Sequence, residues 1–219
     1  MVFVDLEKMP HAMYAGATRS GKSFGLMCLI MSLICKHPVN EVNLVIFDIG
    51  ASTLDVLKSI PHLSHPIVKS RDEGIHVIQS LMEEMERRID LSSAELCNLP
   101  AIVCVMDEYT SFIGSIDSGQ PQQRVADNIS DLLRRGRKGK IHMVLATQDP
   151  TNKTMGVEVG NITSRMAFKV ARFQTSIAIL NCAGAEKLPG SGTMLYQSEE
   201  YPDPIYMGPM RTQHLKYGG

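Results

Sequence analysis

The stretch GATRSGKS, residues 16–23, fits the phosphate-binding pattern G-x-x-x-x-G-K-[ST]. Its glycines let the backbone curl so that successive N–H groups point at a β-phosphate, and a helix starting near Lys22 adds the positive end of its dipole. Lys22 would bridge β- and γ-phosphate oxygens, and the Ser23 hydroxyl would ligate Mg²⁺. An accidental glycine turn should match this pattern in about one chain in a hundred. We therefore predict ATP and Mg²⁺ as ligands, with these nucleotide-binding residues: Gly16, Ala17, Thr18, Arg19, Ser20, Gly21, Lys22, Ser23 and Phe24.

A second candidate group is the acidic pair Asp107 and Glu108, which directly follows the apolar run at 102–106. The carboxyl end of a buried strand is where an open α/β sheet binds its ligand. Asp107 would hold Mg²⁺ through water, and Glu108 would polarise the water that attacks the γ-phosphate. The pair could instead simply cap a strand and start a turn. Beside a phosphate loop, it favours a hydrolase over a protein that only holds nucleotide.

A third candidate is Gln148, which follows the apolar run IHMVLA at 141–146. If that strand lies next to the acidic one, the amide can contact both the γ-phosphate and the attacking water. Gln148 could equally be an ordinary strand terminus.

The elements that would position these residues alternate between strands and helices. Apolar β-like runs are expected as strands at 12–15, 43–47, 101–106, 141–146 and 165–170, with short pieces at 193–197 and 205–208. Helical periodicity predicts helices at 22–36, 72–90 and 122–137, and composition predicts a loop at 114–121. This alternation is typical of an α/β fold with a mostly parallel central sheet flanked by helices.

Composition narrows the class of protein further. The 219 residues contain 22 Lys and Arg against 23 Asp and Glu, so binding of nucleic acid through bulk charge is excluded, although a local basic patch is not. Five cysteines without a C-x-x-C pair argue against a disulfide scaffold or a zinc site. The longest apolar run, 24–35, is too short to cross a bilayer. We expect a cytosolic chain that does not itself contact a membrane.

Taken together, these motifs resemble the FtsK/SpoIIIE family of motor ATPases. The matching stretches run through nearly the whole chain: Pro10-His11, GATRSGKS, IPHL at 60–63, MERR at 85–88, Asp107-Glu108, LLRRGRKGKIHMVLATQ at 132–148, ITSRMAFKV at 162–170 and GAEKLPGSGTMLY at 184–196. IPHL and the stretch at 184–196 are much more specific than a phosphate loop. The resemblance implies a RecA-like P-loop NTPase with a small C-terminal β extension. It also implies a single motor domain over 1–219, with a core at about 10–197 and a C-terminal strand and tail at 198–219.

The resemblance further implies an ATPase that assembles as a ring of six copies and moves double-stranded DNA in chromosome segregation or conjugative transfer. Two alternatives stay open: a type VII secretion-like ATPase that moves proteins, and a nucleotide-binding regulatory module with little turnover. We expect the chain to be a fragment of a longer parent. Other parts of that parent would place it at the inner face of the cell membrane or in a secretion or conjugation complex.

This sequence departs from the family pattern at three places. Arg19 occupies a loop position that is usually small and adds a positive charge beside the phosphates. Residues 48–50 (Asp-Ile-Gly) stand where DNA pumps usually carry Asp-Pro-Lys, and Asp149 stands where an arginine is common. These departures leave ATP hydrolysis expected, and they make a coupling ATPase of a mobile element at least as good a fit as a chromosome pump.

Ring ATPases commonly complete the site with an arginine from the neighbouring copy, which stabilises charge on the γ-phosphoryl group. By resemblance, Arg165 is our first candidate for this role and Arg135 the second. Arg165 could instead be a strand-edge residue. Arg135 belongs to the basic run at 134–140, which could also be a favourable placement of cations at a helix C-terminus or a contact to a polyanion.

Overall fold

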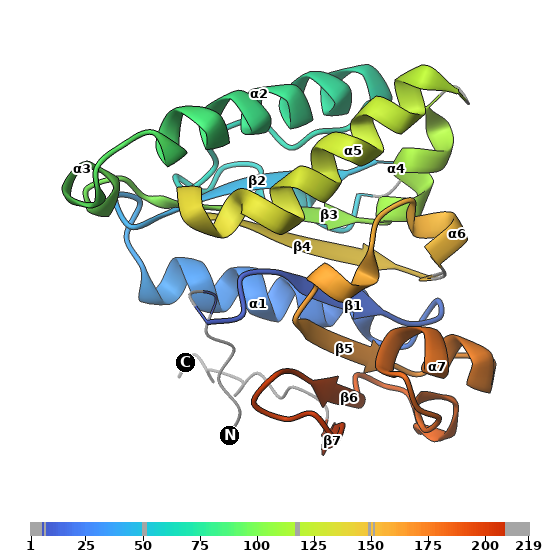
Figure 1. Cartoon of the computed structure of the whole chain (residues 1–219). Coiled ribbons are helices and arrows are strands. Elements are labelled where there is room, and N and C mark those ends of the chain that lie inside the picture. The colour runs from blue at the N-terminus through green and yellow to red at the C-terminus, as the bar shows by residue number, and fades with distance from the viewer. Residues whose placement is uncertain are drawn as a thin grey trace.

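A seven-stranded sheet forms the centre of the molecule in this computed structural model, which describes residues 6, 8–49, 52–116, 119–148, 150 and 152–208. The strands lie in the order β2-β3-β4-β1-β5-β6-β7 (Figure 1). The first five are parallel to one another, β6 pairs antiparallel with β5, and β7 pairs antiparallel with β6. Their bounds are β1 Ala12–Ala15, β2 Val42–Asp48, β3 Ala101–Asp107, β4 Ile141–Thr147, β5 Ser164–Phe168, β6 Met194–Gln197 and β7 Ile205–Met207.

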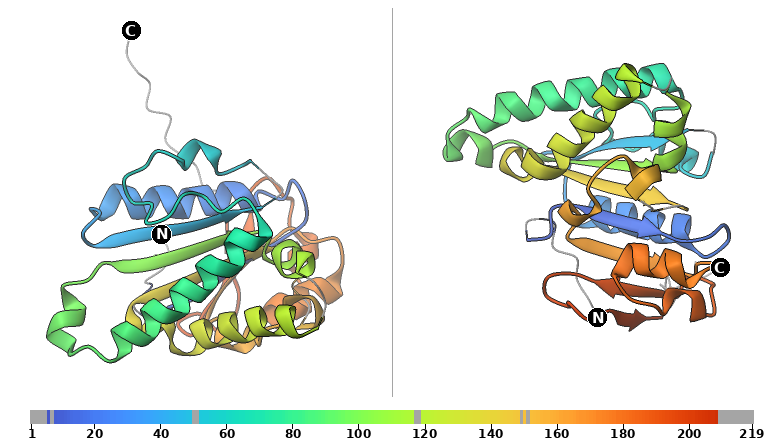
Figure 2. Two further views of the ribbon diagram at one scale, coloured as in Figure 1. Left: turned by 90° about the horizontal axis from the view of Figure 1, so that it is seen from above. Right: turned by 45° about the vertical axis from the view of Figure 1, so that its right-hand side comes forward.

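Helices cover both faces of this sheet (Figure 2). Helix α1 (Lys22–Lys36) packs on one face, where Leu26 and Ile30 join a core with alternate strand residues such as Tyr14. Helices α2 (Arg71–Ile89), α4 (Tyr109–Ser115) and α5 (Gln120–Arg135) cover the other face, with α7 (Phe173–Leu180) beside them. The two short helices are α3 (Ser93–Cys97) and α6 (Asn152–Met155). A strand buried on both faces is apolar at successive positions, which explains the continuous runs in β3 and β4.

The fold class predicted from the sequence is confirmed. Strand β1 and helix α1 begin and end at the predicted residues, and β2, β3 and β4 extend each predicted run by one or two residues. The predicted helix at 122–137 is α5, which starts two residues earlier and gives way to a 3₁₀ turn at Gly136–Gly139. The division into a core and a C-terminal part stays a prediction, although β7 lies in the same sheet as the rest.

The predicted loop at 114–121 is wrong at both ends. Helix α4 continues to Ser115, and α5 already begins at Gln120. Pro121 lies in the first turn of α5, where its missing N–H removes no helical hydrogen bond. A proline that suggested a loop therefore starts a helix. Among the described helices, none is both long and apolar enough to span a membrane.

Candidate active site

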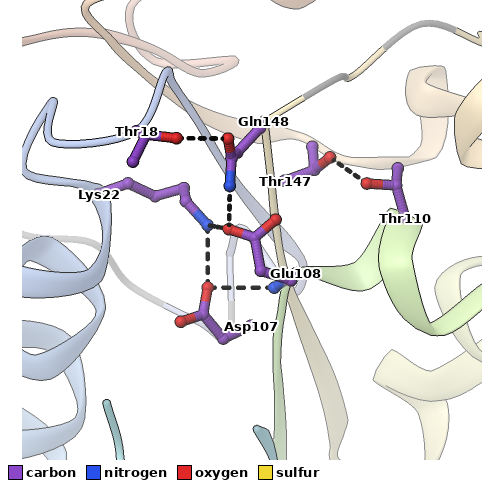
Figure 3. Close-up of polar contacts among 7 residues, drawn as sticks. All are labelled: Thr18, Lys22, Asp107, Glu108, Thr110, Thr147 and Gln148. Carbon is purple, nitrogen blue, oxygen red and sulfur yellow. Dashed lines mark hydrogen bonds and ion pairs between the residues drawn. The ribbon is translucent and has the colours of Figure 1, made fainter. Parts of the chain in front are cut away.

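The three predicted groups leave neighbouring strands at the carboxyl edge of the sheet. The loop 16–21 follows β1, the acidic pair ends β3, and Gln148 follows β4, which lies between β1 and β3. The pairing register puts Ala15 opposite Thr147. Because parallel strands end at the same edge, side chains far apart in the sequence meet there (Figure 3).

The phosphate loop is held in its curled shape by backbone contacts to its neighbours. The Gly16 amide donates to the Thr147 carbonyl at 3.2 Å, and the Ala17 amide donates to the Lys169 carbonyl at 2.9 Å. Arg19 and Gly21 both have a positive φ, of 64° and 103°. The loop is therefore anchored to β4 and β5 before α1 starts.

Two glycines of the loop leave no room for a side chain. A Cβ on Gly16 would lie 2.6 Å from the Phe168 Cβ, and one on Gly21 would lie 2.5 Å from the backbone of Gly192. The Ser20 hydroxyl oxygen is buried and has no hydrogen-bond partner within the described part of the chain. A tight backbone cradle with an unsatisfied polar atom fits a phosphate ligand, because such a ligand brings several acceptors to groups that lack them.

Lys22 reaches from the first turn of α1 to both carboxylates. Its Nζ lies 2.9 Å from Asp107 Oδ1 and 2.6 Å from Glu108 Oε1. The Lys22 side chain is only 5% exposed. A cation this deeply buried must be paired, and here two carboxylates balance one ammonium group.

Glu108 has an unusual backbone conformation. Its φ of 54° is in the left-handed region, where a residue with a Cβ is strained. Its amide donates to Asp107 Oδ1 at 3.0 Å, and helix α4 begins at the next residue. The bend turns the Glu108 side chain back toward Lys22 instead of along the strand direction (Figure 3).

Gln148 connects the phosphate loop to Glu108. Its Nε2 donates to Glu108 Oε1 at 3.0 Å, while its Oε1 accepts a hydrogen bond from the Thr18 hydroxyl at 2.8 Å. One amide thus contacts the carboxylate expected to act as base and the loop expected to hold phosphates. In this position the amide can respond both to a ligand in the phosphate loop and to the Glu108 carboxylate.

The residues predicted to hold Mg²⁺ are Ser23 and Asp107. Ser23 lies in the first turn of α1 and is half-buried, and Asp107 lies at the end of β3. The described residues contain no group of three or more His, Cys, Asp or Glu side chains arranged to hold a metal by themselves. Mg²⁺ is commonly bound by one or two protein groups together with substrate phosphates and water, so Ser23 and Asp107 stay the predicted ligands.

The two candidate arginines do not join this cluster. Arg165 donates to three backbone carbonyls of its own chain, those of Ile162, Ile179 and Val159, and burial lowers the pKa of its guanidinium. Arg135 forms a bidentate ion pair with Glu86, which raises the Arg135 pKa. A role for either in a neighbouring copy stays a prediction.

Most of the basic run is already paired. Arg134 binds Asp131 at 2.6 Å, and Lys140 Nζ donates to the Leu99 carbonyl. The run precedes β4 and so lies at the amino edge of the sheet, opposite the phosphate loop. These contacts fit the interpretation that the cations are favourably placed at the C-terminus of helix α5, which requires no polyanion. Two of the departures from the family pattern, Gly50 and Asp149, lie outside the described residues.

Sequence reasoning missed two features of the site. Thr110 and Thr147 share a hydrogen bond of 2.9 Å between their hydroxyl groups beside Glu108 and Gln148. The turn at residues 190–192 packs on the phosphate loop, and the Gly192 amide donates to the Ser20 carbonyl at 2.9 Å. The G-S-G triplet within the specific stretch 184–196 was the available signal for the turn, whereas a single threonine gave none.

Comparisons with known proteins show which sequences this chain is similar to. Residues 1–98 match the profile of the FtsK/SpoIIIE family. A protein of Halalkalibacterium halodurans named DNA translocase FtsK is 38% identical over 218 residues, covering 89% of this chain and 27% of that protein. DNA translocase SpoIIIE of Bacillus subtilis is 34% identical with the same coverage. The chain thus spans about a quarter of the length of these relatives, and the resemblance found in the sequence is confirmed.

Solved structures show the same fold at lower identity. The conjugation coupling protein TcpA of pCW3, solved as a monomer with ATPγS, superposes with a TM-score of 0.78 at 21% identity, covering 93% of this chain and 60% of that one. ATPases 2 and 3 of Thermomonospora curvata EccC, solved with a signal sequence peptide, give a TM-score of 0.77 at 18% identity, covering 96% of this chain and 38% of that one.

Proposed function

We propose that this chain, which is homologous to the FtsK/SpoIIIE family over most of its length, is the ATP-binding and ATP-hydrolysing motor domain of a translocase that moves double-stranded DNA. The observation that carries the proposal is the convergence of Lys22, Glu108 and Gln148 next to a phosphate loop too tight for side chains.

Nucleotide binding would redistribute the charges around Lys22. Without ligand, its ammonium group is bound by Asp107 and Glu108. The oxygens of a triphosphate carry more negative charge than one carboxylate and would draw Lys22 toward them. Glu108 then loses its cation and becomes able to accept a proton.

Mg²⁺ would be held by the Ser23 hydroxyl and, through water, by Asp107. When bound, it neutralises charge on the phosphate oxygens and so acts as a Lewis acid. Asp107 already lies beside Lys22, so a Mg²⁺ ion held there through water and the Lys22 ammonium group would neutralise the negative charge of the substrate from neighbouring positions.

Glu108 is the proposed general base for water attack on the γ-phosphate. Gln148 would orient the same water, since its amide is already 3.0 Å from Glu108. The strained backbone at Glu108 supports this role, because such strain is commonly retained at functional positions.

A ring of copies, which we propose to be a hexamer, would supply the missing cation. Arg165 stays the first candidate and Arg135 the second. Arg165 would have to give up three hydrogen bonds to carbonyls, whereas Arg135 would give up a bidentate ion pair with Glu86 and a long one, of 4.0 Å, with Asp131. Arg135 is therefore the more easily released of the two, and substitution of each should be tested.

Double-stranded DNA is the proposed substrate because the relatives that match along this chain are named DNA translocases. With a net charge of −1, the chain would contact the DNA backbone locally and without sequence preference. A protein substrate is the second candidate, supported by the likeness to EccC, which was solved with a signal peptide. A regulatory module with little turnover is the third.

We propose a cytoplasmic location, where ATP is available and where the five cysteines, all free in the structure, stay reduced. Attachment at the inner face of the membrane, or to a secretion or conjugation complex, would come through other regions of a longer parent.

The test is ATP hydrolysis with and without duplex DNA, over a range of salt and protein concentrations. A DNA motor should be stimulated by duplex DNA, and the stimulation should fall steeply as salt rises. Stimulation by a signal peptide but not by DNA would favour the secretion ATPase. Turnover no faster than that of Lys22→Ala and Glu108→Gln at every concentration would favour the regulatory module.

A further inference from the structure

We propose that Thr110 and Thr147 are positioning residues whose paired hydroxyl groups hold Glu108 against Gln148 and the phosphate loop. This inference rests on the proposed function, because it assigns the pair a part in ATP hydrolysis. It concerns two residues to which the motifs in the sequence assigned no role.

Thr147 connects three parts of the site. It is the last residue of β4 and is fully buried. Its carbonyl accepts a hydrogen bond from the Gly16 amide, the first of the phosphate loop, and its hydroxyl lies 2.9 Å from the Thr110 hydroxyl. The next residue is Gln148, so a movement of Thr147 is passed directly to the amide that contacts Glu108.

Thr110 lies near Glu108 in the sequence, just as Thr147 lies next to Gln148. It lies two residues after Glu108, in the first turn of α4, and its side chain faces Thr147 (Figure 3). Helix α4 has only seven residues, and its N-cap, Glu108, makes no side-chain capping bond. The start of such a short helix must be held by contacts to its surroundings.

The side chains of Tyr109 and Thr110 each make such a contact. The Tyr109 hydroxyl donates to the Met155 carbonyl at 2.8 Å, which anchors α4 to α6. The Thr110 hydroxyl anchors α4 to β4 instead. Only the second contact leads to the strand that carries Gln148 and supports the phosphate loop.

The pair therefore closes a ring of interactions. It runs from Thr147 through Gln148 to the Glu108 carboxylate, and returns from Glu108 through Thr110 to Thr147. Among the described residues, the contacts to the Glu108 carboxylate that would remain without the hydroxyl pair are those of the Gln148 amide and Lys22. Because ATP binding draws Lys22 away, the hydroxyl pair matters most during hydrolysis, when misplacement of a reacting group is most costly.

The experiment compares Thr110→Val and Thr147→Val, which remove each hydroxyl while keeping the branched shape, with the double variant. Thr110→Ser and Thr147→Ser restore a hydroxyl and serve as matched controls. We expect kcat for ATP to fall roughly tenfold in each Val variant. The double variant should be no slower than the singles, the Kd for ATPγS should change less than about twofold, and the Ser variants should recover most of the wild-type rate.

Wild-type kcat in the Val variants would overturn the proposal. So would additive losses in the double variant, or a Kd that rises by the same factor as kcat falls. Thr110 is half-buried, so Thr110→Val alone remains decisive if the buried Thr147→Val fails to fold.

A second measurement separates this inference from the proposed function. Hydrogen–deuterium exchange of the ligand-free chain should become faster at 109–115 and 144–148 in the Val variants, with little change in α2. That result is expected even if the wild type does not hydrolyse ATP. Unchanged exchange in both segments would overturn the positioning role, whereas absent wild-type turnover would overturn only the proposed function.

Discussion

Lys22 and Glu108 form a close ion pair, with Lys22 Nζ 2.6 Å from Glu108 Oε1. The cation expected to grip phosphates is thus bound to the carboxylate expected to activate water. The two roles exclude each other while the pair is intact, because the Oε1 atom that binds the ammonium group is not free to accept a proton from water. When Lys22 binds phosphate, it would release Glu108 at the same time. Glu108 would therefore activate water only when nucleotide is bound.

Lys22→Ala should lower the affinity for ATP by at least about 100-fold, because the site loses the ammonium group that binds both carboxylates and would bind the phosphates. It should also destabilise the ligand-free chain by roughly 3 kcal/mol, since the buried Asp107 carboxylate and the half-buried Glu108 carboxylate would lose their partner. Calorimetric titration with ATPγS and urea denaturation measure the two effects. Lys138→Ala, an exposed lysine at the opposite edge of the sheet, is the control and should change neither.

Gly21→Ala should impair both folding and nucleotide binding. The new methyl group would lie 2.5 Å from the Gly192 backbone, so either the phosphate loop or the 190–192 turn must move. Gly156→Ala is the control, because Gly156 also has a positive φ, of 63°, and its new Cβ would come no nearer than 3.7 Å to a neighbouring atom, the Ala126 Cβ. Both should lose about 1 kcal/mol of stability from backbone strain. If ATPγS affinity falls equally in the two variants, the turn does not brace the loop.

Substitutions of Arg19 can separate the effect of its backbone strain on stability from the effect of its charge on nucleotide binding. Its φ of 64° is unfavourable for any residue with a Cβ, so Arg19→Gly should stabilise the chain by about 0.5–1 kcal/mol relative to Arg19→Ala. Both variants remove a positive charge beside the expected phosphates and should weaken ATP binding to the same extent. Thermal unfolding and nucleotide titration distinguish the two effects. Unchanged affinity in both variants would mean that the charge does not act on nucleotide.

Stability should depend on pH through His11. Burial, and to a smaller extent His142, lowers the pKa of His11 from 6.5 to about 3, and its Nδ1 accepts a hydrogen bond from the Met143 amide. The unfolded chain binds this proton near pH 6.5, but the folded chain does not. The contribution of His11 is therefore complete above pH 6.5 and declines as the pH falls toward 3, by roughly 2 kcal/mol at pH 5.

Urea denaturation between pH 7.5 and 4 measures this dependence. His11→Gln should flatten it, while His76→Gln, an exposed histidine on α2, should leave it unchanged. An equal slope in the wild type and His11→Gln would contradict the assignment.

Much of this architecture could be predicted because the informative patterns were local. The phosphate loop, the apolar run before Asp107 and the run before Gln148 each place a polar group at a strand end, and the parallel sheet brings those ends together. Helix α1 was predicted at its observed bounds because a glycine–lysine turn precedes it and its apolar run is continuous.

What could not be predicted depends on contacts between distant segments. The Thr110–Thr147 hydrogen bond joins residues 37 apart, and neither residue differs locally from an ordinary threonine. The packing of Gly192 on Gly21 joins the two halves of the chain. Helices α4 and α7 were missed because they have only seven and eight residues, too short for a helical period to be recognised. The paired state of Arg135 depends on Glu86 in another helix.

The most direct test is single-turnover hydrolysis of ATP by the wild type and Glu108→Gln, with bound nucleotide measured in the same samples. Both proteins should bind Mg·ATP, and only the wild type should release phosphate, with the variant slower by about 100-fold or more. Equal rates of phosphate release, or a variant that fails to bind nucleotide, would contradict the assignment of Glu108 as the base that Lys22 sets free.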